Sequence, residues 1–323
     1  MENIAIISGG FSGESVISVQ SAKYVASNLD PAKFQGFVIL IDKSGWYFLD
    51  ENQKRFEIDR NDFSLPLESE TIQFQRVFNI IHGDPGENGK LTAYFEMLGI
   101  PSTSCDSGLL GLTFNKYYCN QVVKSYGVNT AANVLIHKGA NYSVEDILEN
   151  VGLPCFVKPN SGGSSIGMSK VKTEEELAPA INLAFEQDNQ VMIETFIKGR
   201  EITCGLMISK GIMHVLPLCE VVSKKEYFDF EAKYNPTLAD ELIPAPIDSE
   251  LETVIKSMSS FLYRSLGCNG VVRMDYIVGD ETIHFLEVNT IPGMSAASIV
   301  PQMARAYGWT NQELISRVLD EIN

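Results

Sequence analysis

Positive charge is scarce in this chain. Its 323 residues include 25 Lys and Arg but 41 Asp and Glu, which gives a formal net charge of −16 at pH 7. An acidic surface of this kind repels nucleic-acid backbones and anionic lipid headgroups, so we expect neither a nucleic acid nor a membrane as a partner. Any phosphate ligand must therefore be bound by local groups and metal ions.

Long apolar runs and paired cysteine motifs are also absent. No stretch reaches the ~18 uninterrupted apolar residues of a membrane span, and the segment MENIAIISGG lacks the basic region of a signal peptide. The six cysteines show no C-x-x-C spacing, which disfavours a zinc site or a disulfide framework. The sequence thus favours a cytoplasmic enzyme or binding protein with buried thiols.

Two nucleotide-binding fingerprints are missing too. The chain has no G-x-x-x-x-G-K-[ST] loop, which excludes a P-loop, and no G-x-G-x-x-G spacing, which argues against a dinucleotide site. A hydride-transfer enzyme is accordingly the least favoured class of enzyme.

What the chain does contain is enough apolar material for a large core. Hydrophobic residues make up 45% of it, and at about 100–200 residues per domain its length suggests two or three domains. Strand and helix signals alternate through the first third, which predicts an α/β fold with a parallel sheet and crossover helices. The segments are 4–8, 36–41 and 76–81 as strands, and 14–29 and 90–100 as helices.

We expect three domains, at residues 1–103, 104–189 and 190–323. A hairpin is predicted over 270–289, and the polar segment from about 223 to 240, which has no helical or strand period, is interpreted as an active-site lid. Capping boxes predict three helix starts, because a Ser or Thr is followed three residues later by Glu. They are Thr173 with Glu176, Ser249 with Glu252, and Thr310 with Glu313.

The hairpin carries the clearest chemical signal. Arg273 and Asp275 lie two apart on its first strand, and Glu287 and Asn289 lie two apart on its second, so each pair projects from one face of its strand. If the register agrees, these groups share one face and offer the hard oxygen ligands that suit Mg²⁺ with substrate phosphates. The alternative is a solvated hairpin face with weak ion pairs.

Two glycine-rich loops could bind anions or a small substrate. The loop SGGSS, residues 161–165, closely follows Lys158 and can bring backbone N–H groups near phosphate oxygens, although a simple mobile turn has the same composition. Glu14 follows the first strand and could hold a ligand or only cap a helix. His82 ends another strand and could be a ligand-binding or a structural histidine.

Taken in order, these segments resemble the D-alanine:D-alanine ligase family of the ATP-grasp superfamily through nearly the whole chain. The matching motifs are GGFSGE, HGDPGENG, VKPNSGGSSIGMSKV, EAKY, VVRMDY and FLEVNTIPGMSAASIVP, with NK at 115 and 116. The resemblance implies a three-domain α/β architecture with an N-terminal parallel domain. ATP would be bound between the central and C-terminal ATP-grasp subdomains.

The resemblance implies a role for each polar residue above. Those that would bind ATP are Lys116, Lys158, Ser165, Glu194, Phe196, Ile197, Glu201 and Lys233, of which Glu194 would contact the adenine and Glu201 the ribose. Those that would carry two Mg²⁺ ions, for which Mn²⁺ can substitute, are Asp275, Glu287 and Asn289. Those with catalytic roles would be Glu14, Ser164, Tyr234, Arg273 and Gly293, and those at the substrates His82, Ser298 and Ile299.

The implied activity is ATP-dependent ligation of two D-alanines through an acyl phosphate, for peptidoglycan precursor synthesis, by a cytoplasmic homodimer. Two alternatives stay open: an ATP-grasp ligase with another second substrate, such as D-serine, D-lactate or a different amino acid, and a regulatory nucleotide- or metal-binding protein without turnover. Ala297 stands where the family often has His, next to the second substrate. A binding module needs no Arg273 to stabilise an oxyanion, so the sequence favours the enzyme.

Overall fold

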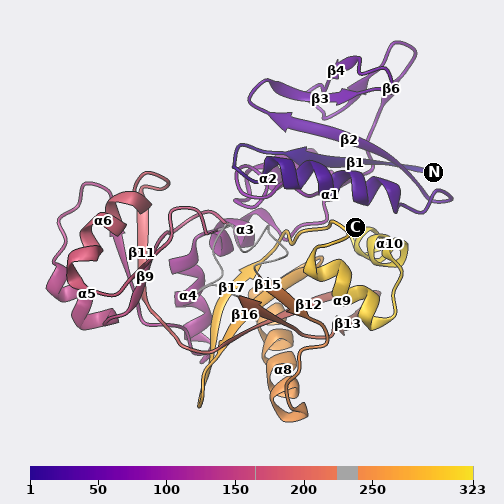
Figure 1. The fold of residues 1–323 in the computed structure, drawn as a ribbon. Helices are drawn as coiled ribbons and strands as arrows, with labels where there is room; N and C mark the ends of the chain where they lie inside the picture. Colours follow the sequence, from indigo (N-terminus) through magenta and orange to yellow (C-terminus); the bar gives the residue numbers. More distant parts are fainter. Residues whose placement is uncertain (164, 224–238, 323) are drawn as a thin grey trace.

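The computed structural model describes residues 1–163, 165–223 and 239–322. Within them, three main sheets lie in three lobes of a mixed α/β fold, with the N-terminal lobe above the other two in Figure 1. None of the helices in this described part is both long enough and apolar enough to cross a lipid bilayer.

The N-terminal sheet has the strand order β4-β3-β2-β1-β7. Strand β1 pairs in parallel with β2 on one side and β7 on the other, which confirms the predicted parallel sheet with crossover connections. Ligands of such sheets bind where the strand order reverses, here at the carboxyl ends of β1 and β7. The elements are β1 (Glu2–Gly9), α1 (Ser15–Ser27), β2 (Phe34–Asp42), β7 (Arg76–Asn79) and α2 (Lys90–Leu98).

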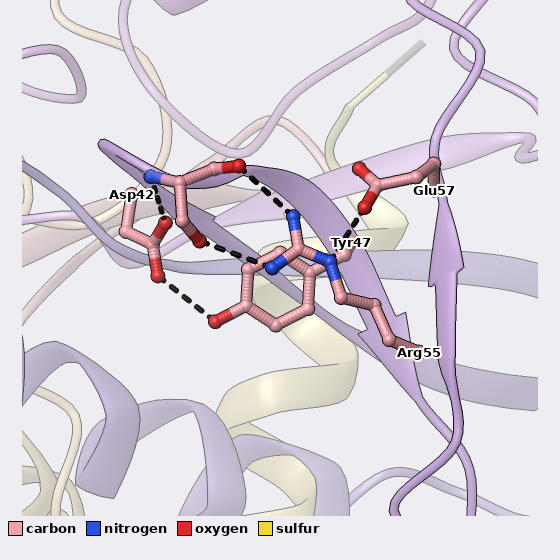
Figure 2. A network of polar contacts seen from close by, with 5 residues as sticks. Asp42, Tyr47, Arg55 and Glu57 are labelled. Atoms are coloured by element: carbon pink, nitrogen blue, oxygen red, sulfur yellow. Dashed lines mark hydrogen bonds and ion pairs between the residues drawn. The ribbon is translucent and has the colours of Figure 1, made fainter.

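An antiparallel edge, which the sequence analysis did not predict, extends this sheet through β3 (Gly45–Leu49) and β4 (Arg55–Glu57). Figure 2 shows the polar network that holds it: the hydroxyl of Tyr47 donates to Asp42 at 2.9 Å, and the Arg55 guanidinium stacks 3.7 Å from the Tyr47 ring centroid. Nη1 and Nη2 of Arg55 donate to the hydroxyl and the carbonyl of Ser44 at 3.1 and 3.0 Å, so the turn after β2 is fastened to β4. Two short strands, β5 (Leu65–Pro66) and β6 (Thr71–Ile72), form a separate pair.

The middle sheet has the order β10-β9-β11-β8, with α5 and α6 beside it (Figure 1). Its buried core joins residues of these two helices to the strands. Strand β11 pairs with both β8 and β9, so the predicted domain boundary at residue 190 falls just before a central strand of this sheet. The elements are β8 (Asn133–His137), α5 (Val144–Val151), β9 (Cys155–Pro159), β10 (Ser169–Val171), α6 (Glu174–Ala184) and β11 (Gln190–Thr195).

The third sheet runs in the order β15-β14-β12-β16-β17, with β13 paired to β12. Helices α3 (Ser107–Phe114) and α4 (Lys116–Ser125) share its apolar core with α8, although they precede the middle sheet in the chain. The elements are β12 (Arg200–Ser209), β13 (Ile212–Val215), β14 (Cys219–Ser223), β15 (Ala239–Leu242), α8 (Ser249–Leu266), β16 (Val272–Val278) and β17 (Ile283–Asn289).

The last two helices, α9 (Ile299–Tyr307) and α10 (Asn311–Asp320), connect the third sheet to the N-terminal lobe. One buried cluster contains Ile6 of β1, Val25 of α1, Met303 of α9 and Leu314 of α10. This shared core brings the carboxyl ends of β1 and β7 close to the loop that follows β17. Loops from all three sheets therefore face one region.

Candidate active site

The hairpin β16–β17 forms the floor of this region. After a register shift between Asp275 and Tyr276, the pairing places Arg273 opposite Asn289 and Asp275 opposite Glu287. Nε and Nη2 of Arg273 donate to the two oxygens of Asp275, each at 2.9 Å, and Nδ2 of Asn289 donates to Asp275 Oδ2 at 2.9 Å. The four predicted side chains thus share one face of the hairpin.

Burial decides against a solvated hairpin face. The side chain of Asp275 is only 5% exposed and that of Arg273 20% exposed. Burial alone would lower the pKa of Arg273, but the charge and hydrogen bonds of Asp275 raise it overall, so the guanidinium stays charged. Burying such a set of charges costs desolvation free energy, and a buried, hydrogen-bonded set of charges is typical of a functional site.

Thr203 is a member of this floor that the sequence analysis missed. It lies opposite Asp275 on the neighbouring strand β12, is 1% exposed, and its hydroxyl donates to Asp275 Oδ1. Asp275 is therefore oriented by three side chains from three adjacent strands. No local sequence signal connects a threonine on β12 with this carboxylate.

The donor set of the floor fits a hard divalent cation. Among the described residues, no three His, Cys, Asp or Glu side chains are grouped so as to hold a metal ion on their own. The floor instead offers two carboxylates and one carboxamide, and Mg²⁺ ordinarily completes such a partial set with substrate phosphates and water. The hairpin floor therefore fits a divalent cation that is bound together with a polyphosphate.

The loop of residues 161–165, here called the serine-rich loop, is anchored beside this floor. Nζ of Lys116, at the start of α4, donates to the carbonyl of Gly162, and the Lys116 backbone N–H donates to Asn160 at 3.0 Å. The N–H of Ser161 donates to Asp188 Oδ2 at 2.7 Å. These bonds fix the start of the loop, which a simple mobile turn would not require.

Lys158 and Glu194 form a buried ion pair in the middle sheet. Nζ of Lys158 lies 2.7 Å from Oε1 of Glu194, and the two side chains are 9% and 6% exposed. Phe196 follows β11, its ring packs edge-on against Phe156 with centroids 5.7 Å apart, and Ile197 beside it is half-buried. Predicted nucleotide-binding groups thus lie on β9, on β11 and on the link to β12, which itself carries Glu201.

Glu14 faces the serine-rich loop from the N-terminal lobe. It occupies the N-cap position of α1 but makes no side-chain capping bond. A Cβ atom added to Gly163 would lie 3.0 Å from Oε2 of Glu14, so the carboxylate lies directly against that loop. The arrangement favours a ligand-facing carboxylate over a simple cap.

His82 is buried, with 7% of its surface exposed, at the carboxyl end of β7. A hydrogen bond links it to the backbone of Ile291, while Nε2 is buried without a hydrogen-bond partner among the described residues. Burial lowers its pKa below 6.5, although the charge of Glu14 acts in the opposite direction, so the ring is neutral at pH 7. A buried unpartnered nitrogen is an available contact for a substrate.

Glu87 is a second residue that the sequence analysis missed. Its Oε2 accepts from the Gly83 N–H at 2.7 Å and so closes the loop that carries His82. Burial, followed by the negative charge of Glu14, raises the pKa of Glu87 to about 8, and Lys116 and Glu287 also act on it. Carboxylates from two loops and the floor therefore share one electrostatic environment.

The pKa of Glu87 predicts a pH-dependent stability. The folded chain retains a proton that the unfolded chain loses between about pH 4.5 and about pH 8, so the free energy of unfolding should fall as pH rises through this window. In Glu87→Gln, which keeps an acceptor for Gly83, this part of the fall should vanish, a change on the order of 1–3 kcal/mol. Urea unfolding at pH 5 and pH 8 measures it.

The matched control is Glu70→Gln, since Glu70 is exposed. The control should keep the wild-type pH dependence. An equal fall in wild type and Glu87→Gln would show that the Glu87 proton is not involved.

The loop after β17 closes the region. A Cβ atom on Gly293 would lie 2.8 Å from Oγ of Ser298, so a side chain at this position would displace that hydroxyl. Oγ of Ser298 also accepts from the Ser295 N–H at 3.0 Å, and Ile299 begins α9 directly after it. The loop thus presents the backbone of Gly293 and the start of α9 to the same region as His82.

Three predicted residues, Ser164, Lys233 and Tyr234, lie outside the described residues, as does most of the predicted lid. Ser165 is described and has a positive φ of 57°, a backbone conformation that is uncommon for a residue other than glycine.

Comparisons with known proteins agree along the whole chain. The family model described as "D-ala D-ala ligase N-terminus" matches residues 3–105, and "D-ala D-ala ligase C-terminus" matches residues 122–320. A D-alanine–D-alanine ligase from Flavobacterium johnsoniae is 44% identical, with 99% of each chain covered. One from Azobacteroides pseudotrichonymphae is 41% identical, with 100% of each chain covered.

Solved structures with the same fold include VanG D-Ala:D-Ser ligase from Enterococcus faecalis, with a TM-score of 0.88, 30% identity and 98% of both chains covered. Another is D-alanyl-alanine synthetase A from Vibrio cholerae, with a TM-score of 0.88, 26% identity and 99% of this chain and 98% of that chain covered. Fold, site and relatives define an ATP-dependent ligase of ATP-grasp architecture. The chain belongs to the D-alanine–D-alanine ligase family.

Proposed function

We propose that this enzyme uses ATP to join two D-alanine molecules into D-alanyl-D-alanine, a peptidoglycan precursor. The observation that carries the proposal is the hairpin floor, where Arg273 and Asp275 face Asn289 and Glu287 in register beneath the anchored serine-rich loop. This arrangement supplies charge for a phosphoryl transfer and a fixed cation for an oxyanion in one place. The relatives with 41–44% identity carry the name of the same activity.

The ATP-binding roles follow the placement of the basic and acidic groups. Lys116 and Lys158 would hold the phosphates, as would Lys233 from outside the described residues, and Ser165 would add a contact from the loop. Glu194, Phe196, Ile197 and Glu201 would hold the adenine and ribose. Asp275, Glu287 and Asn289 would hold two Mg²⁺ ions, which when bound neutralise charge on the triphosphate. Mn²⁺ has the same preference for oxygen ligands.

The first D-alanine would lie between the N-terminal lobe and the serine-rich loop. Glu14 would bind its ammonium group, and Ser164 and Tyr234 would extend that contact. Its carboxylate oxygen would attack the γ-phosphorus of ATP, which releases ADP and leaves an acyl phosphate. The neutral His82 would contact this substrate without adding charge.

The second D-alanine would lie near Ser298 and Ile299. Its amine would attack the acyl carbon and form a tetrahedral oxyanion, which then expels inorganic phosphate as the peptide bond forms. The Arg273 guanidinium and the Gly293 N–H would donate hydrogen bonds to that oxyanion. No protein nucleophile is needed, because ATP supplies the activation.

The proposal extends to the organisation of the molecule. The division at 1–103, 104–189 and 190–323, a homodimeric state and a cytoplasmic location would accord with it. The pairing of β11 with β8 and β9 supports moving the second boundary beyond residue 195.

Phosphate release tests the activity directly. Purified enzyme with ATP, Mg²⁺ and D-alanine should release phosphate, and mass spectrometry of the product should show D-alanyl-D-alanine. ATP binding with no phosphate release under any of these conditions would support a regulatory binding protein instead.

The choice of second substrate should depend on Tyr234. A tyrosine has a reference pKa of about 10 and stays neutral at pH 7, so it does not repel an incoming ammonium group, whereas a histidine can become cationic. We expect the wild-type enzyme to make dipeptide when D-alanine competes with D-lactate at pH 7. Tyr234→His should shift the product toward the D-lactate ester.

The product ratio, read by mass spectrometry, decides this prediction. Tyr234→Phe serves as the control, because it removes the hydroxyl without adding charge and should keep the dipeptide preference. Dominant ester from the wild-type enzyme would contradict the assignment.

A further inference from the structure

Two cysteine thiols meet where the N-terminal lobe joins the third sheet. Cys105 lies just before α3, and Cys268 lies just after α8. Both thiols are free, and Sγ of Cys105 contacts the backbone of Asn269, the residue directly after Cys268. The fold thus brings together two cysteines that are far apart in the sequence.

The backbone fixes the position of Cys268. Gly267 ends α8 in the left-handed conformation with φ +74°, and the Cys268 N–H then donates to the carbonyl of Tyr263 at 2.9 Å. The hydroxyl of Tyr263 in turn donates to the carbonyl of Gly270 at 2.8 Å. Hydrogen bonds on both sides therefore hold Cys268 in place.

Cys105 is held against the residue that follows Cys268. Its Sγ donates to the carbonyl of Asn269 at 3.2 Å and accepts from the N–H of Asn269 at 3.3 Å. Asp106 caps α3 by accepting from the Leu109 N–H at 2.9 Å, which fixes the backbone on the other side of the thiol. The Cys105 sulfur thus lies within hydrogen-bond distance of the backbone that directly follows Cys268.

The two thiols differ in access to solvent, and the pair differs from the other cysteines. Cys105 is 0% exposed and Cys268 is partly exposed, so a small oxidant reaches Cys268 first. The remaining four thiols are buried.

We propose that Cys105 and Cys268 are a redox-active pair that forms an intramolecular disulfide when the enzyme meets hydrogen peroxide. In the first step the Cys268 sulfur attacks the peroxide, the O–O bond breaks, and a sulfenic acid and one water form. In the second step the Cys105 sulfur attacks the sulfenic sulfur, the S–O bond breaks, and a second water leaves with the thiol proton. The two thiols lose two electrons, which reduce the peroxide.

The position of the bond gives it a physical effect. It would close a loop that contains α4 and the whole middle sheet, and it would tie the segment before α3 to the residues that lead into β16 and Arg273. Closing a long loop restricts the unfolded chain, so the oxidised enzyme should melt at a higher temperature. A thiol reductant should reverse the change.

Peptide mapping of the wild-type enzyme tests this pair. Native protein is treated with hydrogen peroxide, the remaining thiols are blocked with N-ethylmaleimide in denaturant, and the digest is analysed by mass spectrometry. We expect a peptide pair linked through Cys105 and Cys268, with a mass about 2 Da below the sum of the reduced peptides. Dithiothreitol before blocking should abolish the link, and the four other cysteines should appear alkylated as internal controls.

Cys268→Ala provides the matched variant. It removes the accessible thiol, so Cys105 should then remain reduced under the same treatment, and the melting temperature should no longer rise with peroxide. Absence of the linked peptide from oxidised wild-type protein would overturn the proposal, as would stable overoxidation of Cys268 or its pairing with a second chain.

Discussion

Glu287→Gln is expected to reduce phosphate release by at least about a thousandfold while the enzyme stays folded. Glu287 lies opposite Asp275 in the hairpin floor. An amide is close to a carboxylate in shape, but it has no charge, and its NH₂ end cannot bind a hard cation. The floor would then neutralise the triphosphate poorly, and the transferring phosphoryl group would lose stabilisation in its transition state.

The hairpin itself supplies the control. Glu281→Gln makes the same chemical change at an exposed position on the turn between β16 and β17, and it should leave turnover and stability unchanged. Phosphate release and the melting temperature are measured for both variants. A folded Glu287→Gln enzyme with near-normal turnover would remove Glu287 from the proposed metal site.

Arg273→Lys should lower kcat by about 10²–10³-fold, although the charge is kept. Two nitrogens of the guanidinium bind both oxygens of Asp275 at 2.9 Å, and a lysine ammonium cannot reproduce this planar fork. The donor proposed for the oxyanion would be displaced, and Asp275 would lose part of its orientation. Loss of one buried charged hydrogen bond should also cost about 1–3 kcal/mol of stability.

The steady-state parameters separate this role from a purely structural one. A residue that acts in the transition state lowers kcat, whereas a general loosening of the fold lowers the melting temperature and leaves the kcat of the folded fraction intact. Arg264→Lys, at an exposed position on α8, is the control and should match the wild type. A folded Arg273→Lys enzyme with kcat within about threefold of the wild type would contradict the oxyanion role.

Each pair of the hairpin floor was predictable, because side chains two residues apart on a strand project from one face: Arg273 with Asp275, and Glu287 with Asn289. Their common face was not predictable, because the register shifts between Asp275 and Tyr276, and an unbroken ladder from the turn would set Glu287 opposite Met274. Thr203 was not predictable, because β12 precedes β16 by many residues and nothing in either strand specifies their register. Glu87 was missed for a similar reason, since its environment depends on loops from different lobes.

Helix starts show the same limit at a smaller scale. The capping box at Thr310 and Glu313 forms with both of its hydrogen bonds, as predicted. The start of α6 after Thr173 is confirmed, but the capping box does not form: the Thr173 side chain makes no capping bond, and Glu176 accepts from the Lys172 N–H at 2.7 Å. At α8 the predicted Ser249 is replaced by Asp248, whose carboxylate accepts from the Leu251 N–H at 2.8 Å.

These differences have one physical cause. Several residues near each helix start can accept the first free N–H groups, and small differences in free energy among them decide which one does. The position of a helix is therefore more predictable than the hydrogen bonds that begin it. The antiparallel strands β3 and β4 were missed because β3 is half-buried along its whole length and the edge strand β4 has only three residues, so neither gives a clear alternating pattern.

Between turnovers, Lys158 and Glu194 form an ion pair with each other. Their 2.7 Å contact neutralises two charges in a place where either ion alone would be costly. If both bind nucleotide as proposed, ATP must separate them when it enters, and part of its binding free energy is consumed in doing so. When ADP departs, the two side chains form their ion pair again and stabilise the enzyme without nucleotide. The pair therefore lowers the affinity for ADP and returns the site to the state that binds the next ATP.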